Sequence, residues 1–183
     1  TSIGEKAFSD CSNLKSVVIP DSVTFIGSSA FSGCSSLASI TLPHSLTSIS
    51  ASTFAGCTSL TSVTIPDSVT SIGSCAFVGC ENLTSISIPD SVLSIGSKAF
   101  LGCNNLANDA GLIIIRDILF GCLASKVYVT VPDSVTSISD SAFQYCDNLT
   151  SVIIPNSAAS IGANAFFCQH SLTSVILPES ITV

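Results

Sequence analysis

Hydrophobic and polar residues follow one order that repeats every 23 residues along most of the chain. The prolines show this period most plainly, because neighbouring copies keep the same spacing on both sides of one interruption. They are Pro20, Pro43, Pro66 and Pro89, followed by Pro132, Pro155 and Pro178. A period of this length over a whole chain is the signature of a repeat architecture.

Each copy contains a short alternating run before its proline. In the copy that reaches Pro66, the apolar residues Val63 and Ile65 alternate with the polar residues Ser62 and Thr64. A period of two predicts a β-strand with one buried face. Because proline cannot donate a hydrogen bond to a strand ladder, Pro66 is expected to end this strand.

The second half of each copy is expected to return the chain to the core. After the turn residues that follow the proline, Val69 and Ile72 supply apolar side chains, and Gly73 supplies a permissive backbone position. Residues 76–80 are too few for a stable helix. One helical or 3₁₀ turn is therefore predicted there.

Three apolar columns can be followed through the copies. Phenylalanine recurs at Phe8, Phe31, Phe54, Phe77, Phe100, Phe120, Phe143 and Phe166. Leucine follows six residues later at Leu14, Leu37, Leu60, Leu83, Leu106, Leu149 and Leu172. Isoleucine precedes the phenylalanine at Ile3, Ile26, Ile49, Ile72, Ile95, Ile138 and Ile161. One unit cannot enclose a core, but stacked units align these columns inside a solenoid of about eight repeats.

The order Leu-x-x-Val-x-Ile-Pro, closed by Ala-Phe-x-x-Cys, resembles the BspA-like leucine-rich repeats over almost all of residues 1–183. The resemblance implies a right-handed, β-rich solenoid with a parallel sheet on one face and short helical or 3₁₀ turns opposite. That family is associated with microbial surfaces, adhesion and protein binding. It thus implies a non-catalytic binding scaffold that is extracellular or on the cell surface, and it leaves an intracellular location open.

Composition and charge agree with this fold and restrict the partners. Charged residues make up 9% of the chain, against about 25% in ordinary globular domains, and serine and threonine take their place. The net charge of −7 argues against nucleic acid and anionic membranes as partners. The longest apolar run, from Leu112 to Ile115, is far shorter than the roughly 20 residues of a membrane span.

The domain prediction is a single solenoid over residues 1–183 with one irregular repeat at residues 104–131. In that repeat Phe100 and Phe120 are separated by 20 residues, and a turn signal precedes Leu112. The preferred interpretation is a degenerate unit of two tightly joined strands. The alternative is a hinge or docking site between residues 1–103 and 120–183. Both chain ends fall inside a repeat without a polar cap, so further repeats or a partner are expected at the ends.

Nine cysteines are present, and most share one column. The column members are Cys11, Cys34, Cys57, Cys80, Cys103, Cys122 and Cys146. Cys168 is displaced by one position, which leaves Gln169 in register, and Cys75 is additional. Such regularity favours buried thiols that pack as small apolar residues, although oxidation between adjacent units stays open. No Cys-x-x-Cys pair is present, so zinc is not predicted.

Candidate catalytic and metal-binding residues are few. His44 and His170 belong to no catalytic motif, and neither an enzyme nor a cofactor is predicted. An acidic turn column comprises Asp21, Asp67, Asp90, Asp133 and Glu179. Stacked carboxylates could bind calcium, but aspartate after proline already has a local role in turn hydrogen bonding. No metal site is predicted.

Two glycosylation sequons occur in the same register, at Asn82 and Asn148. They matter only for a chain secreted by a eukaryote. Chance also produces such motifs in a chain this rich in serine and threonine. The sequence does not decide whether they are used.

The outward strand positions give the predicted partner site. In the middle of the chain these positions carry hydroxyl residues, whereas the C-terminal block carries Tyr128, Thr130, Ile153 and Ile176. Exposed apolar residues on adjacent strands often mark interaction sites, although ordinary strand propensity also explains isoleucine here. The predicted function is a scaffold that binds a protein partner on this face. The alternatives are an architectural spacer or subunit, and, more remotely, ice or mineral binding through Ser/Thr rows.

Overall fold

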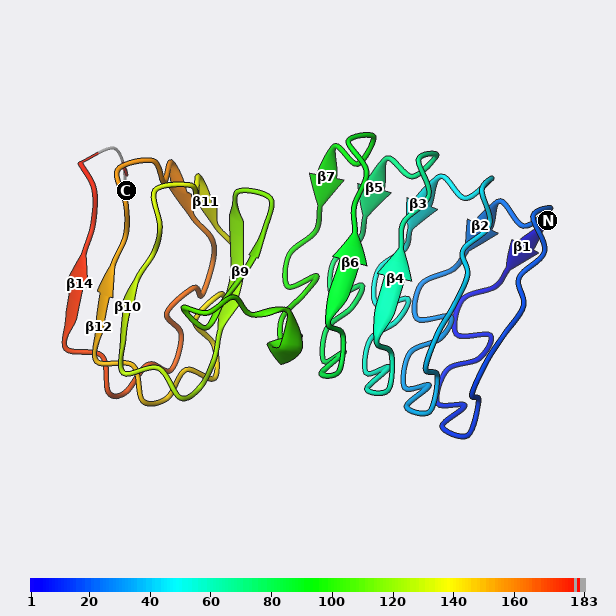
Figure 1. Cartoon of the computed structure of the whole chain (residues 1–183), viewed down its shortest axis with the longest axis horizontal. Helices are drawn as coiled ribbons and strands as arrows, with labels where there is room; N and C mark the ends of the chain where they lie inside the picture. Colours follow the sequence, from blue (N-terminus) through cyan, green and yellow to red (C-terminus); the bar gives the residue numbers. More distant parts are fainter. Residues whose placement is uncertain (180, 182–183) are drawn as a thin grey trace. The chain divides into compact units, whose positions relative to one another are not determined.

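The computed structural model describes residues 1–179 and 181, which form two compact units, Thr1–Leu106 (unit 1) and Ala107–Val183 (unit 2). In each unit the chain winds through stacked turns with short parallel strands on two sides (Figure 1). The predicted repeat solenoid is confirmed. The unit boundary falls inside the irregular repeat at residues 104–131, and the single array over residues 1–183 stays a prediction.

Unit 1 contains three parallel sheets. Its strands are β1 (Ser2–Ile3), β2 (Phe25–Ile26), β3 (Ser48–Ile49), β4 (Ser62–Thr64), β5 (Ser71–Ile72), β6 (Ser85–Ser87) and β7 (Ser94–Ile95). The sheets are β1–β2, β3–β5–β7 and β4–β6. Partner residues lie 23 positions apart, as Ser62 and Ser85 do, so the sequence period is also the strand register. The strand predicted before Pro66 is β4, whereas the short strands that contain the isoleucine column were not predicted.

The core of unit 1 is built from the predicted columns. Phe31, Phe54, Phe77 and Phe100 are fully buried. Their rings stack with centroids 5.8, 5.4 and 5.5 Å apart in successive pairs. Stacked rings and aligned leucines bury apolar surface that no single turn could bury, which is why the turns depend on one another.

The segment predicted as a helical turn is instead a run of hydrogen-bonded turns. Within residues 1–179 and 181, the helical element is the short 3₁₀ helix η1 (Asn104–Leu106). In a representative turn, the amides of Ala30 and Cys34 donate to carbonyls three residues back, whereas the amide of Phe31 donates 2.9 Å to Thr53 of the next turn. Alternate amides therefore pair between turns, and a continuous helix cannot form.

Glycine is required where neighbouring turns approach most closely. A Cβ atom built on Gly73 would lie 2.6 Å from the backbone nitrogen of Ala51 in the previous turn. A second glycine column has positive φ, as at Gly79 with a φ of 71°, where other residues are strained. Both columns thus have a steric cause.

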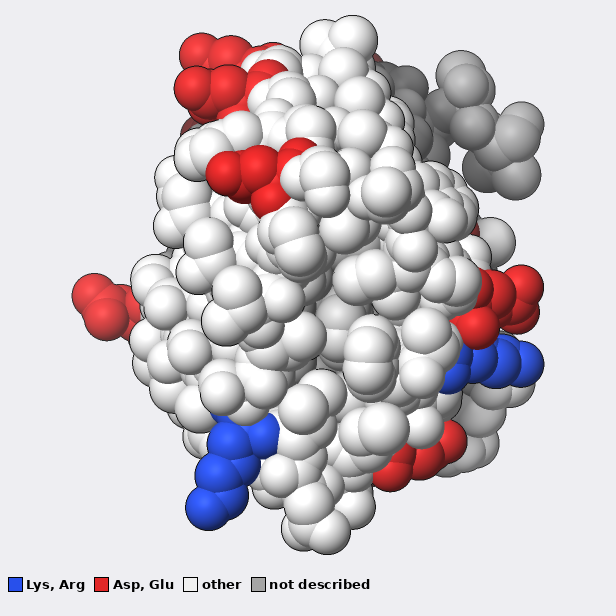
Figure 2. All heavy atoms as spheres, turned by 90° about the vertical axis from the view of Figure 1, so that its right-hand side faces the viewer, with Lys and Arg blue, Asp and Glu red and all other residues white. Residues whose placement is uncertain are grey.

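Hydroxyl side chains also join the turns. The hydroxyl of Ser68 donates 2.7 Å to the carbonyl of Leu46, and the hydroxyl of Thr84 donates 3.1 Å to the carbonyl of Thr61. Much of the high serine and threonine content therefore serves the stack. Seen from the end where the chain begins, most of the visible surface is formed by uncharged residues (Figure 2).

Unit 2 begins with a hairpin and continues as a solenoid. Its strands are β8 (Leu112–Ile115), β9 (Ile118–Cys122), β10 (Tyr128–Thr130), β11 (Ser137–Ile138), β12 (Ser151–Ile153), β13 (Ser160–Ile161) and β14 (Ser174–Ile176). One sheet has the order β10–β12–β14 and the other β13–β11–β9–β8, in which β8 is antiparallel to β9. The preferred interpretation of two tightly joined strands is confirmed, and the hinge or docking alternative stays a prediction.

Candidate interaction surface

The sheet β10–β12–β14 has one face in the core and one in solvent. Val129 and Val152 point inward and are buried. The residues on either side of each valine point outward because side chains alternate along a strand. All four predicted site residues, Tyr128, Thr130, Ile153 and Ile176, lie on the outward face of this sheet.

The apolar residues of this face lie on successive strands. Ile153 is directly opposite Ile176 in the parallel register, and Thr130 is opposite Ile153. Tyr128 is two residues before Thr130, so its Cα lies about 8 Å diagonally from that of Ile153, given the usual strand spacing and rise. The exposed fractions of Tyr128, Ile153 and Ile176 are 77%, 39% and 55%. These three residues are called the unit 2 patch below.

Two other residues near the patch are exposed for a different reason. Val175 and Leu177 occupy core positions of the repeat, whose equivalents Val152 and Ile154 are buried. They are exposed because they belong to the last turn that the structure describes. Ile176 alternates with them along the strand. Its position in the repeat faces outward in the other copies as well.

The corresponding face of unit 1 is mostly hydroxylic. Ser62 and Thr64 on β4, and Ser85 and Ser87 on β6, are exposed at the outward positions. Val18 is the apolar exception, with an exposed fraction of 92%. The unit 2 patch therefore differs from unit 1 in residue type at equivalent positions.

A shallow hollow of about 340 Å³ lies on this face of unit 1. It is lined by hydroxyl residues, by the exposed His44 and by three apolar residues, Ile40, Leu42 and Pro66. His170 of unit 2 is exposed as well. Among residues 1–179 and 181, no group of three or more His, Cys, Asp or Glu side chains could hold a metal ion.

The cysteine column of unit 1 has a hydrogen-bonding role. The thiol of Cys80 donates to the carbonyl of Phe54 at 3.1 Å, and the thiol of Cys103 donates to the carbonyl of Phe77 at 3.0 Å. Cys34 and Cys57 make the same bond to the preceding turn. Each thiol thus fills a small apolar space and also serves a buried carbonyl group, which explains why cysteine suits this position.

Burial controls the ionisation of these thiols. Burial raises the pKa of the Cys103 thiol to about 12. A hydrogen bond from the backbone of Cys80 lowers this pKa, but by less than burial raises it. Burial also raises the pKa values of Cys34, Cys57 and Cys80. The four buried thiols, those of Cys34, Cys57, Cys80 and Cys103, are therefore protonated and unreactive at neutral pH.

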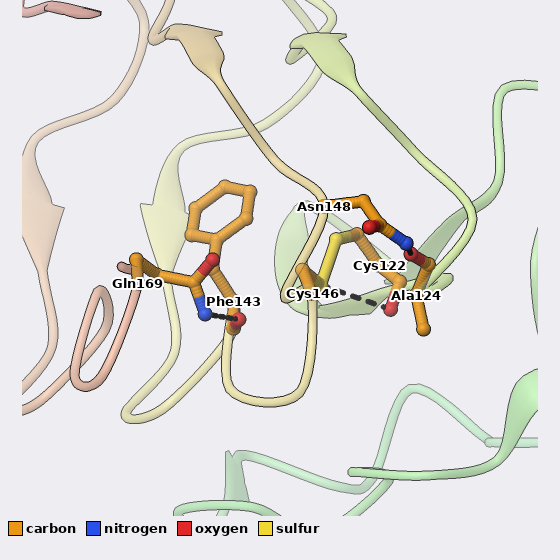
Figure 3. Close-up of a disulfide and its surroundings, with 6 residues drawn as sticks. All are labelled: Cys122, Ala124, Phe143, Cys146, Asn148 and Gln169. Atoms are coloured by element: carbon orange, nitrogen blue, oxygen red, sulfur yellow. Dashed lines mark hydrogen bonds between the residues drawn. A yellow bond between two sulfur atoms is a disulfide. The ribbon is translucent and has the colours of Figure 1, made fainter. Parts of the chain in front are cut away.

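One pair departs from the expected thiol column. Cys122 and Cys146 form a disulfide, with Cα atoms 6.5 Å apart (Figure 3). The expectation of reduced thiols is wrong for this pair. Only one residue separates Phe120 from Cys122, whereas two separate Phe143 from Cys146. The shorter spacing places Cys122 on β9, so its sulfur faces Cys146.

The two sequon asparagines also bond between turns. The Nδ2 group of Asn82 donates 2.8 Å to the carbonyl of Thr58, and that of Asn148 donates 3.1 Å to the carbonyl of Ala124. Both residues are exposed. Their amides support the stack, so a structural role accounts for asparagine at both positions.

Five exposed apolar residues were not predicted from the sequence. They are Phe25, Leu93, Val127, Tyr145 and Phe167. Tyr145 has a φ of 70° at the position where Gly79 and Gly102 stand in other copies. Its departure from the glycine column was the signal that could have drawn attention to it. Among the described residues, no helix is both long and apolar enough to cross a bilayer.

Comparison with known families and structures gives consistent matches. The profile of the BspA type leucine rich repeat region matches residues 1–111 and 113–183, in six copies. No curated protein sequence matches the chain.

Several solved structures resemble the whole chain. A leucine rich cell surface protein from Faecalibacterium prausnitzii is 35% identical with a TM-score of 0.74, covering 100% of this chain and 52% of its own. A leucine-rich repeat protein from Eubacterium ventriosum is 26% identical with a TM-score of 0.73 and the same coverage. A leucine rich repeat protein from T. pallidum is 31% identical with a TM-score of 0.63, covering 94% of this chain and 72% of its own. The chain spans about half the length of the first two.

Proposed function

Because the chain belongs to the BspA-type leucine-rich repeat family, we propose that it is a non-catalytic scaffold that binds a protein partner through the outward face of unit 2. The repeat architecture supplies a rigid frame, since successive turns share core columns and hydrogen bonds. Repeat folds host many functions, so the proposal depends on the surface and not on the fold alone.

The observation that carries the proposal is the pairing of Ile153 with Ile176 beside the exposed Tyr128. Apolar side chains on adjacent strands lose water contact together when a partner covers them. Tyrosine is enriched in interface cores because it combines apolar area with a hydroxyl group. Thr130 would supply a polar contact at the edge of the same surface.

The location of such a scaffold is part of the proposal. The neighbour from Faecalibacterium prausnitzii is a cell surface protein, which supports an extracellular or surface location for this chain. Adhesion to another cell or protein would be the corresponding role. The disulfide in unit 2 suits an oxidising compartment.

An architectural role has support of its own in unit 1. Its outward strand positions carry mostly hydroxyl groups, which offer little apolar area for a partner. Unit 1 would then act as an architectural spacer. Both roles can be combined in one repeat protein.

A comparison of matched variants tests the proposed function. A partner is first captured on the immobilised chain, purified and identified, and its affinity is then measured. Replacing Tyr128, Ile153 and Ile176 by serine should weaken binding about tenfold or more, because interface anchors carry most of the binding energy. Val18→Ser is the control, since it removes an exposed aliphatic residue at the equivalent position of unit 1. Unchanged affinity of a folded triple variant would reject the proposal.

A further inference from the structure

Carboxylates lie beside the unit 2 patch, at the carboxyl ends of its strands. Asp133 lies three residues after Thr130 on β10, and Glu179 lies three residues after Ile176 on β14. Both residues are exposed. Because the strands are parallel, these ends meet at one edge of the sheet. That edge therefore carries negative charge next to apolar side chains.

A lysine or arginine side chain suits this edge of the sheet. Its apolar stem can lie against the outward aliphatic side chains while its cationic end reaches a carboxylate, since lysine and arginine bury their stems and keep the charge at the tip. Ile176 and Glu179 supply these two kinds of contact three residues apart.

The basic residues of unit 2 are held at the hairpin. Arg116 lies in the turn that joins β8 to β9. Lys126 is half-buried, and a Cβ atom added to Gly111 would overlap its Cε atom, so its stem packs against Gly111. At the opposite ends of the strands, the exposed residue Asp147 adds another carboxylate. Both ends of the patch thus have acidic residues nearby.

From this arrangement we infer that the occupant of the unit 2 patch is a basic, apolar peptide segment of the partner protein, an inference that rests on the proposed function. Its aliphatic side chains cover Ile153 and Ile176. A lysine or arginine beside them bonds to Glu179, and a second basic residue lies near Asp133. Charge-assisted hydrogen bonds to carboxylates are the stronger class, and the net charge of −7 steers a cationic partner toward the chain.

Unit 1 provides an internal comparison. Asp67 and Asp90 occupy the same turn position as Asp133, on neighbouring turns, but the strands before them carry outward hydroxyl groups. Carboxylates without an apolar neighbour attract cations only through screened, long-range forces. The inference therefore assigns specific binding of basic apolar segments to unit 2 and not to unit 1.

Three synthetic peptides of equal length serve as probes in fluorescence anisotropy. In the first, leucines alternate with lysines; in the second, leucines alternate with glutamates; in the third, serines alternate with lysines. The whole chain should bind the leucine–lysine peptide about tenfold more tightly than either other peptide, because both apolar contact and charge pairing are required. Equal binding of the leucine–glutamate peptide, or no binding of any peptide, would overturn the inference.

Matched variants locate the binding. Asp133→Asn with Glu179→Gln should weaken binding of the leucine–lysine peptide about threefold or more and reduce its salt dependence. The control Asp67→Asn with Asp90→Asn should leave it unchanged, and an equal loss in that control would overturn the inference. Circular dichroism verifies that each variant is folded.

The triple serine variant separates this inference from the proposed function. Loss of binding in that variant, with binding retained by Asp133→Asn and Glu179→Gln, overturns the basic partner but leaves the patch as a binding site. Retained binding in a folded triple serine variant overturns both. Loss of peptide binding in the triple serine variant and in the variant with Asp133→Asn and Glu179→Gln supports both the inference and the proposed function, provided that the control with Asp67→Asn and Asp90→Asn still binds.

Discussion

The side-chain amide of Gln169 donates a hydrogen bond of 2.8 Å to the carbonyl oxygen of Phe143 (Figure 3). In unit 1 the buried column cysteines donate the same bond to the phenylalanine of the preceding turn. Glutamine and cysteine share little except a hydrogen-bond donor that reaches this carbonyl. What the two residue types share at this position is therefore a donor that satisfies the carbonyl of the preceding turn.

The donor role predicts that the column cysteines contribute more to stability than the additional one. Cys80→Ala removes a buried sulfur atom and the bond to Phe54, and should lower the free energy of unfolding by about 1–3 kcal/mol. Cys75→Ala is the matched control, because Cys75 is half-buried and lies outside the column. Urea denaturation followed by circular dichroism measures both. Equal effects of the two substitutions would contradict the role assigned to the column.

The raised thiol pKa values predict alkaline instability of unit 1. An unfolded thiol ionises near pH 9, whereas Cys103 ionises at about 12 when folded. Between these values the unfolded state holds fewer protons than the folded state. The stabilisation is thus fully present below pH 9 and is lost as the pH rises toward 12.

The slope of unfolding free energy against pH identifies which thiol causes the alkaline instability. Each such thiol contributes about 1.4 kcal/mol per pH unit inside this window. Cys103→Ser should therefore flatten the decline in unfolding free energy between pH 9 and 11 relative to the unsubstituted chain. All other residues are the same in both proteins, so their contributions cancel in the comparison. Parallel curves for the two proteins would show that Cys103 does not ionise on unfolding.

The disulfide and the thiol column predict a specific labelling pattern. Cys11 and Cys168 are exposed and should react rapidly with a thiol reagent in the native protein. The buried column members should react slowly until denaturant is added. In denaturant without reductant, seven cysteines should label, because Cys122 and Cys146 are paired. Mass spectrometry counts the labels, and nine labels without reductant would refute the disulfide.

The aromatic stack predicts that the turns of unit 1 unfold cooperatively when one ring is removed. Phe77 is fully buried, and its ring stacks on both Phe54 and Phe100. Phe77→Ala should lower the free energy of unfolding by about 3–5 kcal/mol, and the thermal midpoint of unit 1 should fall with it. The exposed residue Val18 provides the control substitution to serine. A midpoint that matches the control would argue against a continuous core column.

The sequence predicted the solenoid and its core because the period aligns identical residues in space. Phe77 and Leu83 needed only the 23-residue spacing to be assigned to the interior, and both are buried. The outward positions of Tyr128, Ile153 and Ile176 likewise followed from strand alternation.

Other features depend on distances between turns that the period does not supply. The disulfide follows from the shortened spacing between Phe120 and Cys122, which shifts one sulfur toward Cys146. The predicted helical turn does not form because amides such as that of Phe31 donate hydrogen bonds to the next turn instead of within their own turn. The carboxylates beside the patch were visible in the sequence as a turn column.

Site-specific photo-crosslinking is the most direct test of the claim that a partner covers the outward face of unit 2. A photoreactive phenylalanine analogue replaces Tyr128 in one protein and Thr64, at an exposed outward position of unit 1, in another. Each is irradiated with the captured partner. Crosslinks are expected from position 128 and none from position 64. Crosslinks from position 64 alone, or from both positions equally, would contradict a partner site on unit 2.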